Sequence, residues 1–442
     1  MNSTHDAIII GTGQAGPSLA ARLSGAGMKI AVIERKLFGG TCVNTGCTPT
    51  KTLVASAYAI HLARQFCNDL QVDMKKLKAR KDAVVARSAI EKWMTGLPNC
   101  EVIKGHARFT APHTVAVGDQ TLISPKIFVN VGARARIPAI PGLDQVPYLT
   151  NSSILDLDFV PPHLIILGGS AVGVEFAQMY RRFGSEVTVI EEASRLLQHE
   201  DEDVSAAVLD IFAKEGINVV LNAHNLAVKR VDGGLCVHNI TGSHLLVATG
   251  RVPNTDDLGL DKAGIATDEH GHIHVDEDCA TNARGVWALG DCNGRGGFTH
   301  TSYNDYEIVA ANLLDQDSRR ISDRINAYAV YIDPPLGRVG MTEAEVRKSK
   351  RPALIGRRPM SKVSRAVEKG ETLGFMKILV DQETKLILGA AILGIGGDEA
   401  IHCILDMMYA GAQSSLMQRA VHIHPTVSEL IPTMLGELKP LT

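Results

Sequence analysis

The sequence predicts an α/β protein made of two Rossmann-like βαβ units followed by an α+β domain at the C-terminal end. An internal repeat carries the first part of this prediction, because one strand–turn–helix–strand pattern occurs twice. An acidic residue at the end of both copies strengthens it. After about residue 325 the pattern changes to alternating strands and one apolar helix, which indicates a separate domain. The 442 residues are enough for two to four domains with their own cores.

The two copies of the repeat align without a gap. The first reads "IIIGTGQAGPSLAARLSGAGMKIAVIE" (8–34) and the second reads "IILGGSAVGVEFAQMYRRFGSEVTVIE" (165–191). In a nucleotide-binding βαβ unit, the first glycine allows the tight turn, the middle position lets the backbone approach a pyrophosphate, and the third allows close helix packing. The final acid binds a ribose hydroxyl. The candidate residues are Gly11, Gly13, Gly16 and Glu34, then Gly168, Ser170, Gly173 and Glu191.

Ser170 departs from the glycine pattern, and its small side chain predicts a looser backbone approach in the second unit. Two βαβ units without any ligand are the alternative interpretation. Two dinucleotide sites in one chain would suggest two cofactors that exchange electrons.

Five further segments extend the prediction. Strands run into a Pro/Gly-rich crossover at 121–142, and short apolar strands at 244–254 and 285–292 each end in a glycine beside a charge. Such strand ends point toward a ligand in α/β sheets, which draws attention to Gly250, Arg251 and Asp291. Alternating strand patterns at 375–394 precede an apolar helix at 398–412 whose surface is suited to burial against a partner.

Composition argues against several classes of function. The formal net charge is −3 and the basic residues are dispersed, so nothing favours nucleic acid or a membrane surface as partner. The first residues lack the pattern of a signal peptide, and no apolar run reaches membrane-spanning length. Eight cysteines in so long a chain do not form a disulfide scaffold. We therefore expect a cytoplasmic protein, in which a persistent disulfide needs a catalytic or sensing reason.

Cys42 and Cys47 lie five positions apart in "GGTCVNTGCTPTKTL" (39–53). A zinc site needs a second close pair of ligands, and the other cysteines are scattered, so we expect no metal. A structural disulfide would close too small a loop to restrain the unfolded chain. In a regular helix the two Cα atoms would be roughly 8–9 Å apart, beyond disulfide range, so Gly46 and Pro49 should distort the segment. A strained disulfide near a helix start is easily reduced, which indicates a redox pair.

These motifs together resemble the class I flavin disulfide reductases, which include lipoamide dehydrogenase, glutathione reductase and mercuric reductase. The resemblance rests on "GGTCVNTGCTPTK" after an N-terminal G-x-G-x-x-G, then "ATGR" (248–251), "ALGD" (288–291), "DPPLGRVGMTE" (333–343) and "HIHPTVSE" (422–429), in the family's order. It runs essentially from end to end. The wording "GCTPTKTLVASA" is most similar to mercuric-reductase-like proteins.

The resemblance implies two Rossmann-like dinucleotide-binding domains plus a C-terminal α+β dimerisation domain. We expect the first part of an FAD-binding domain at 1–148, an NAD(P)-binding domain at 149–265, a central FAD-binding part at 266–325 and the dimerisation domain at 326–442. FAD is expected on the first glycine turn, with Asp291 on its ribityl chain. NADH is expected on the second turn, because Glu191 repels a 2′-phosphate; NADPH stays possible, since Arg195 lies four residues further on.

The resemblance also implies catalytic roles. Cys47 is expected against the flavin as the charge-transfer thiol, and Cys42 is expected to attack the substrate. Lys51 and Glu175 match the family's ion pair beside the flavin, although each is otherwise an ordinary helix charge. His424 and Glu429 match the acid–base pair that a homodimer lends to the other subunit's thiols. Histidine suits this task, since it accepts and returns a proton near neutral pH.

The expected activity is electron transfer from NAD(P)H through FAD to the Cys42–Cys47 disulfide, and then to a disulfide or soft-metal ion. Mercuric ion reduction is one alternative, although mercuric reductases carry a C-terminal cysteine pair and this sequence has no cysteine after Cys403. A dehydrogenase for a protein-bound dihydrolipoyl group is another. A flavoprotein redox sensor is the non-enzymatic alternative. The sequence does not identify the electron acceptor.

Overall fold

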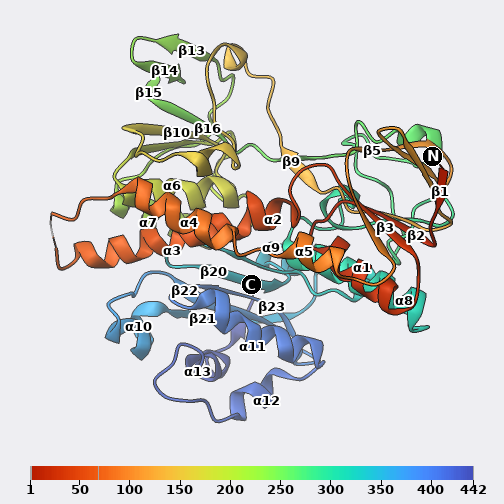
Figure 1. The fold of residues 1–442 in the computed structure, drawn as a ribbon. Helices are drawn as coiled ribbons and strands as arrows, with labels where there is room; N and C mark the ends of the chain where they lie inside the picture. The colour runs from red at the N-terminus through yellow and green to blue at the C-terminus, as the bar shows by residue number, and fades with distance from the viewer. Residues whose placement is uncertain (1, 68, 442) are drawn as a thin grey trace.

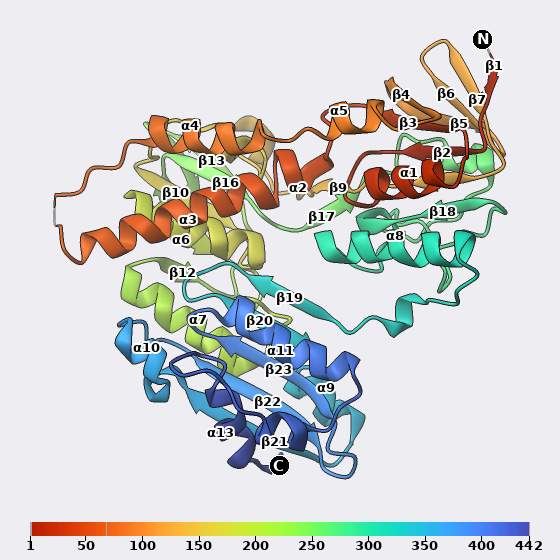
Figure 2. The same ribbon diagram turned by 60° about the horizontal axis from the view of Figure 1, so that its bottom comes forward.

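The computed structural model describes residues 2–67 and 69–441. Figures 1 and 2 show the two βαβ units beside each other, with the C-terminal domain packed below them. This arrangement confirms the predicted mixed α/β class. None of the helices in the described ranges is long and apolar enough to span a membrane.

The first unit is built on a parallel five-stranded sheet in the order β18-β8-β2-β3-β4. Its strands are β2 (Ala7–Ile10), β3 (Ile30–Glu34), β4 (Cys100–Lys104), β8 (Ile127–Val129) and β18 (Val286–Ala288). Helices α1 (Ala15–Gly25) and α8 (Thr299–Leu314) pack together against this sheet. Strands close to the N-terminus therefore pair with strands from the middle of the chain. A second sheet in the order β1-β7-β6-β5 adds β1 (Asn2–Thr4), β5 (Ala107–Ala111), β6 (Thr114–Val117) and β7 (Gln120–Ile123).

The second unit repeats the pattern on a parallel sheet in the order β12-β11-β10-β16. Its elements are β10 (His163–Leu167), α6 (Ala171–Phe183), β11 (Glu186–Ile190), α7 (Glu202–Glu215), β12 (Asn218–Val220) and β16 (His244–Val247). A three-stranded antiparallel sheet covers one side: β13 (Val228–Val231), β14 (Gly234–Val237) and β15 (Ile240–Gly242). The short strands β9 (Ala133–Ala135) and β17 (Arg251–Pro253) pair between the units.

Helix α3 (Cys47–Arg64) leaves the first unit and packs on the second. Its buried residues Leu53 and Ala57 share a core with Phe176 and Tyr180 of α6. The short helix α2 (Gly40–Asn44) precedes it, and α4 (Met74–Val85) and α5 (Ile90–Thr95) lead back to the first sheet. The start of α3 therefore lies where the two βαβ units meet (Figure 2).

The C-terminal domain is a six-stranded sheet in the order β19-β20-β23-β22-β21-β24, antiparallel throughout. Its strands are β19 (Ala327–Val330), β20 (Leu336–Gly340), β21 (Ala353–Pro359), β22 (Phe375–Asp381), β23 (Ile387–Leu393) and β24 (Lys439–Pro440). Its helices are α9 (Glu343–Ser349), α10 (Ser364–Glu368), α11 (Gly397–Tyr409), α12 (Ser414–Arg419) and α13 (Leu430–Gly436).

The predicted alternation of buried and exposed residues at 375–394 is wrong for β22 and β23. Every residue of β23, and all of β22 except Asp381, is buried. The reason is that the sheet has no solvent face here. One side packs under α11 and α13, and the other shares a core with the second βαβ unit. The predicted helix at 398–412 is present as α11.

Candidate functional site

Cys42 and Cys47 lie at a break between two helices, as their spacing predicts. Cys42 belongs to α2, and Cys47 is the first residue of α3. Between them Gly46 turns the chain with φ −134° and ψ −115°. A Cβ atom at Gly46 would lie 2.8 Å from the carbonyl oxygen of Thr41, so this tight turn requires glycine. Both cysteines are free thiols here, with Cys42 half-buried and Cys47 exposed.

The pKa values of the two thiols are shifted in opposite directions. A hydrogen bond from Cys42 is the main cause that lowers the pKa of Cys47. Thr299 and the Lys51 ammonium also lower it, and the pKa falls to about 6 although partial desolvation of the thiol opposes the shift. The same hydrogen bond and burial raise the pKa of Cys42 well above its ordinary range. The reduced pair therefore holds one negative charge at neutral pH, on Cys47.

Lys51 and Glu175 meet as predicted, one turn into α3. Lys51 Nζ lies 2.5 Å from Glu175 Oε2, and the Glu175 side chain is 8% exposed. The second carboxylate oxygen accepts the backbone N–H of Tyr331 at 2.8 Å. The Tyr331 ring lies under the ammonium, with Nζ 4.6 Å from the ring centroid. The pair thus joins α3, α6 and the start of the C-terminal domain.

Thr299 is a site residue that the sequence analysis missed. It is the first residue of α8, and its Oγ1 lies 3.1 Å from Cys47 Sγ. The two residues are 252 positions apart. A threonine at a helix start is ordinary, so no local pattern distinguishes it.

The first glycine turn has the close packing expected of a nucleotide-binding turn. A Cβ at Gly11 would lie 2.3 Å from the Asn130 carbonyl oxygen, and one at Gly16 would lie 2.4 Å from the Gly11 carbonyl oxygen. A Cβ at Gly13 would lie 2.9 Å from the Oδ1 atom of Asn130, which also accepts the Gly16 N–H at 3.1 Å. Glu34 accepts hydrogen bonds from the backbone N–H and hydroxyl of Thr12, which fix the acid at the end of β3.

The second turn repeats this geometry. A Cβ at Gly168 would lie 2.4 Å from the Ala248 carbonyl oxygen, and one at Gly173 would lie 1.9 Å from the carbonyl oxygen of Gly168. Ser170 is extended, with φ −81° and ψ −179°, and precedes the first residue of α6. Both Glu191 carboxylate oxygens accept backbone N–H groups, from Gly169 at 2.5 Å and Ala193 at 2.7 Å. The acid therefore lies directly against its own glycine turn.

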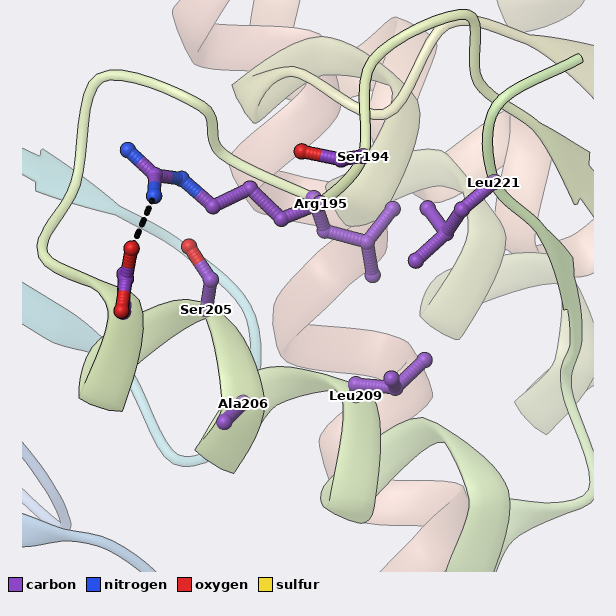
Figure 3. A pocket seen from close by; sticks show the side chains of 8 residues that line it. Ser194, Arg195, Ser205, Ala206, Leu209 and Leu221 are labelled. Atoms are coloured by element: carbon purple, nitrogen blue, oxygen red, sulfur yellow. Dashed lines mark hydrogen bonds and ion pairs between the residues drawn. The ribbon is translucent and has the colours of Figure 1, made fainter.

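A hollow of about 290 Å³ opens beside the second turn, between the segment after β11 and helix α7. Arg195 lies at its edge and points toward the start of α7 (Figure 3). Its guanidinium contacts the Glu202 carboxylate at 3.3 Å and donates to the Gln198 carbonyl oxygen at 3.0 Å. Arg195 is thus engaged with its own loop. The lining residues are Ser194, Arg195, Leu196, Glu202, Ser205, Ala206, Leu209 and Leu221.

Asp291, Gly250 and Arg251 lie together where the two units join. Arg251 reaches Asp291 at 3.4 Å and donates to the Ala133 carbonyl oxygen at 2.6 Å. Burial raises the pKa of Asp291, and the guanidinium of Arg251 opposes this. Gly250 has φ +112°, which explains the glycine before Arg251.

His424 and Glu429 also form a pair. His424 Nδ1 lies 3.0 Å from Glu429 Oε2, and the imidazole is 72% exposed. They belong to the segment between α12 and α13, which lies across the six-stranded sheet from α2 in both views (Figures 1 and 2). The structure therefore brings this pair together but keeps it away from the thiols of its own chain. Within the described residues, no cluster of three or more His, Cys, Asp or Glu side chains is arranged to hold a metal.

Comparison with known proteins identifies the class. The family model of pyridine nucleotide-disulphide oxidoreductases matches residues 5–305, and that of their dimerisation domain matches residues 326–435. The chain belongs to this family, the class I pyridine nucleotide-disulfide oxidoreductases. It is therefore a flavin-dependent enzyme that uses FAD and a pyridine nucleotide, and its dimerisation domain supports a homodimer.

Individual relatives show which members of the family the chain resembles. The chain is 37% identical to the probable pyridine nucleotide-disulfide oxidoreductase RclA of Escherichia coli, over 98% of this chain and 99% of the relative. It is 32% identical to a mercuric reductase of Streptomyces lividans, over 97% and 94%. It is also 32% identical to a dihydrolipoyl dehydrogenase of Thermus scotoductus, over 96% and 95%.

A solved structure gives the same result. The Cu(II) complex of the HOCl-induced flavoprotein disulfide reductase RclA from Escherichia coli superposes with a TM-score of 0.93 at 36% identity. The match covers 99% of this chain and 100% of that one. The chain is thus similar to a flavoprotein disulfide reductase of the RclA type and is related to mercuric reductase and lipoamide dehydrogenase.

Proposed function

We propose that this enzyme takes two electrons from NADH and delivers them, through the Cys42–Cys47 pair, to a disulfide or soft-metal acceptor. The observation that carries the proposal is the unequal thiol pair at the α2–α3 break. One thiol has a pKa lowered to about 6 and the other has a pKa raised by the same hydrogen bond. A pair in which one sulfur holds the charge and the other holds the proton is suited to reversible disulfide chemistry.

The residues present fit both expected cofactors. In the first unit, the turn of Gly11, Gly13 and Gly16 is too tight for a side chain. Glu34 ends β3, and Asp291 lies in the short 3₁₀ turn that follows β18 of the same sheet. We assign these residues to FAD. Bound FAD would pass the two electrons of the reduced nucleotide to the disulfide.

The second unit would hold the nucleotide, on Gly168, Ser170, Gly173 and Glu191, with Gly250 and Arg251 at its entrance. A carboxylate beside the turn favours a free ribose 2′-hydroxyl over a 2′-phosphate. Arg195 is bound to Glu202 and Gln198, which leaves Glu191 as the charge that faces the turn. We therefore propose NADH as the preferred donor.

The thiols and the acid–base pair have separate roles in the second half of the reaction, the transfer of electrons from the thiols to the acceptor. Cys47 keeps the negative charge on the flavin side, and Cys42 attacks the acceptor. Attack requires removal of the Cys42 proton, and His424 of the partner subunit would accept it. The carboxylate of Glu429, 3.0 Å from Nδ1, would orient the ring and stabilise its cationic form. Lys51, paired with Glu175, would keep positive charge beside Cys47.

Cu(II) is the first acceptor to test, because the relative RclA has been solved as a Cu(II) complex. Hg(II) and lipoamide follow, because relatives are named mercuric reductase and dihydrolipoyl dehydrogenase. The experiment is anaerobic steady-state NADH oxidation with each acceptor, glutathione disulfide included, by wild-type enzyme and Cys42→Ser. An acceptor counts only if Cys42→Ser loses its turnover. If no acceptor depends on Cys42, the proposed thiol route is wrong.

A further inference from the structure

The hydroxyl of Thr299 reaches the redox thiols from a distant part of the chain. Its Oγ1 lies 3.1 Å from Cys47 Sγ, and the same hydroxyl also lowers the pKa of the Cys42 thiol. A thiolate has no hydrogen to donate, so in the charged state the hydroxyl must be the donor to Cys47. Hydrogen bonds to charged groups are stronger than neutral ones. The contact therefore gains strength when Cys47 becomes a thiolate.

The position of Thr299 is fixed by its neighbours in the chain. The Phe298 ring lies between two others: its centroid is 5.4 Å from that of His300 and 5.3 Å from that of Tyr328, with interplanar angles of 10° and 6°. His300 Nε2 lies 2.7 Å from the Ala327 carbonyl oxygen, and Tyr328 donates its hydroxyl to Glu200 at 2.5 Å. Residues on both sides of Thr299 are thus held, so the hydroxyl needs no reordering to meet Cys47.

Several other groups face Cys47. Cys42 approaches from α2, and the Lys51 ammonium lies one turn further along α3. Tyr331 and Glu175 lie behind Lys51 and bring a phenol and a carboxylate near the thiol. Lys51 is already paired with Glu175, which offsets part of its charge. Cys47 also starts α3 and Thr299 starts α8, so two helix N-termini meet at the sulfur.

We propose that Thr299 is a thiolate-stabilising residue, whose hydroxyl holds the negative charge of the reduced pair on Cys47. Two electrons break the Cys42–Cys47 bond, one proton goes to Cys42, and Cys47 stays as the thiolate that accepts the Thr299 hydrogen bond. The inference rests on the proposed function, which supplies those electrons from the nucleotide. It goes further by giving the thiols a partner that no sequence motif indicated.

The test compares Thr299→Val, which removes the hydroxyl at nearly constant volume, with Thr299→Ser, which keeps it. Each holoenzyme is reduced anaerobically by two electrons, and the long-wavelength thiolate-to-flavin absorbance is titrated with pH. In wild type the band should disappear as pH falls through about 6, the pKa of Cys47. The midpoint should rise by about one pH unit in Thr299→Val. Thr299→Ser should stay within a few tenths of a unit of wild type.

A second readout does not depend on the absorbance of the band. Equilibration with a dithiothreitol redox buffer at pH 7 measures how readily the disulfide is reduced. A rise of one unit in the Cys47 pKa should lower that equilibrium constant about fivefold in Thr299→Val, and Thr299→Ser should restore it.

Each outcome decides the inference. It is overturned if Thr299→Val titrates like wild type, or if Thr299→Val and Thr299→Ser shift alike, because packing would then be the cause. If Thr299→Val does not retain FAD, Thr299→Ala is judged by the same criteria. A wild-type enzyme without any band would instead contradict the proposed roles of Cys42 and Cys47. The two failures are therefore distinguishable.

Discussion

Lys51 and Glu175 form a 2.5 Å ion pair that joins helix α3 to helix α6 across 124 positions of the sequence. The Glu175 carboxylate is nearly buried and also accepts the Tyr331 backbone N–H, so it has two partners. Removal of one member of such a pair leaves the other charge uncompensated. The pair also places an ammonium near Cys47, where it lowers the pKa of that thiol.

Lys51→Met should therefore weaken the site in two ways. The thiolate band of the two-electron-reduced enzyme should disappear at a higher pH than in wild type, because the ammonium no longer favours the charged form of Cys47. Flavin reduction by NADH, followed by stopped-flow bleaching, should slow by about tenfold or more. Lys78→Met is the matched control, since Lys78 pairs with Asp82 on α4, away from the thiols. Equal bleaching rates in wild type and Lys51→Met would contradict the assignment.

The assignment of the two cysteines predicts opposite spectra for two similar variants. Cys47→Ser should show no long-wavelength band after reduction. Cys42→Ser should show the band without any reductant, because Cys47 is then a free thiolate. The serine hydroxyl can donate to Cys47 in place of the Cys42 thiol, so the band in Cys42→Ser should titrate close to the wild-type value of about 6. Its absence from Cys42→Ser at every pH would reverse the two roles.

The parts of the molecule that the sequence predicts are those set by local pattern. Gly11 and Gly168 repeat in the same strand–turn–helix context, and both prove to have positive φ and no room for a side chain. The C-x4-C spacing likewise required a break in the helix, which Gly46 provides.

The parts that it does not predict depend on tertiary contacts. Thr299 meets Cys47 because α8 and α3 start at the same point, and neither segment carries a signal for the other. Asn130 supports the first glycine turn from a neighbouring strand for the same reason. The buried outer face of β22 and β23 was missed because it depends on which domain covers that sheet.

Glu191 should decide the choice of nucleotide. NADH should give a higher kcat/KM than NADPH, since the carboxylate lies against the turn and repels a 2′-phosphate. Glu191→Gln removes one charge and should reduce this preference by about tenfold. Glu192→Gln is the matched control, because the neighbouring Glu192 lies near His224 instead. A clear NADPH advantage in the wild type would refute this interpretation of Glu191.

Arg195 provides a second test of the preference for NADH over NADPH. Its guanidinium is held by Glu202 and the Gln198 carbonyl oxygen, at the edge of the hollow in Figure 3. Glu202→Gln should release it and lower KM for NADPH by a few-fold, as expected for an exposed ion pair. The same variant should leave KM for NADH unchanged. An equal change for both nucleotides would place Arg195 outside the recognition of the 2′ position.

His424 should act on the partner's thiols, because the segment before α13 that carries it lies on the far side of the six-stranded sheet from α2 and α3 (Figure 2). His424→Ala should leave flavin reduction by NADH nearly intact and slow the thiol–acceptor half by roughly 10² to 10⁴. Glu429→Gln, which keeps the shape of the side chain but loses its charge, should show a smaller effect of the same kind. A variant that slows both halves equally would indicate a structural role instead.

A mixed dimer makes the sharper test. When His424→Ala and Cys42→Ser subunits associate, action in trans gives one site with both groups intact and one site with neither, because a two-fold axis builds both sites from both chains. Each parent dimer should be nearly inactive, whereas a heterodimer purified on two different tags should recover about half of the wild-type rate. If His424 acted within its own chain, the heterodimer should stay inactive, since each subunit would then lack one of the two groups. A heterodimer that stays as inactive as its parents would show that His424 serves its own chain.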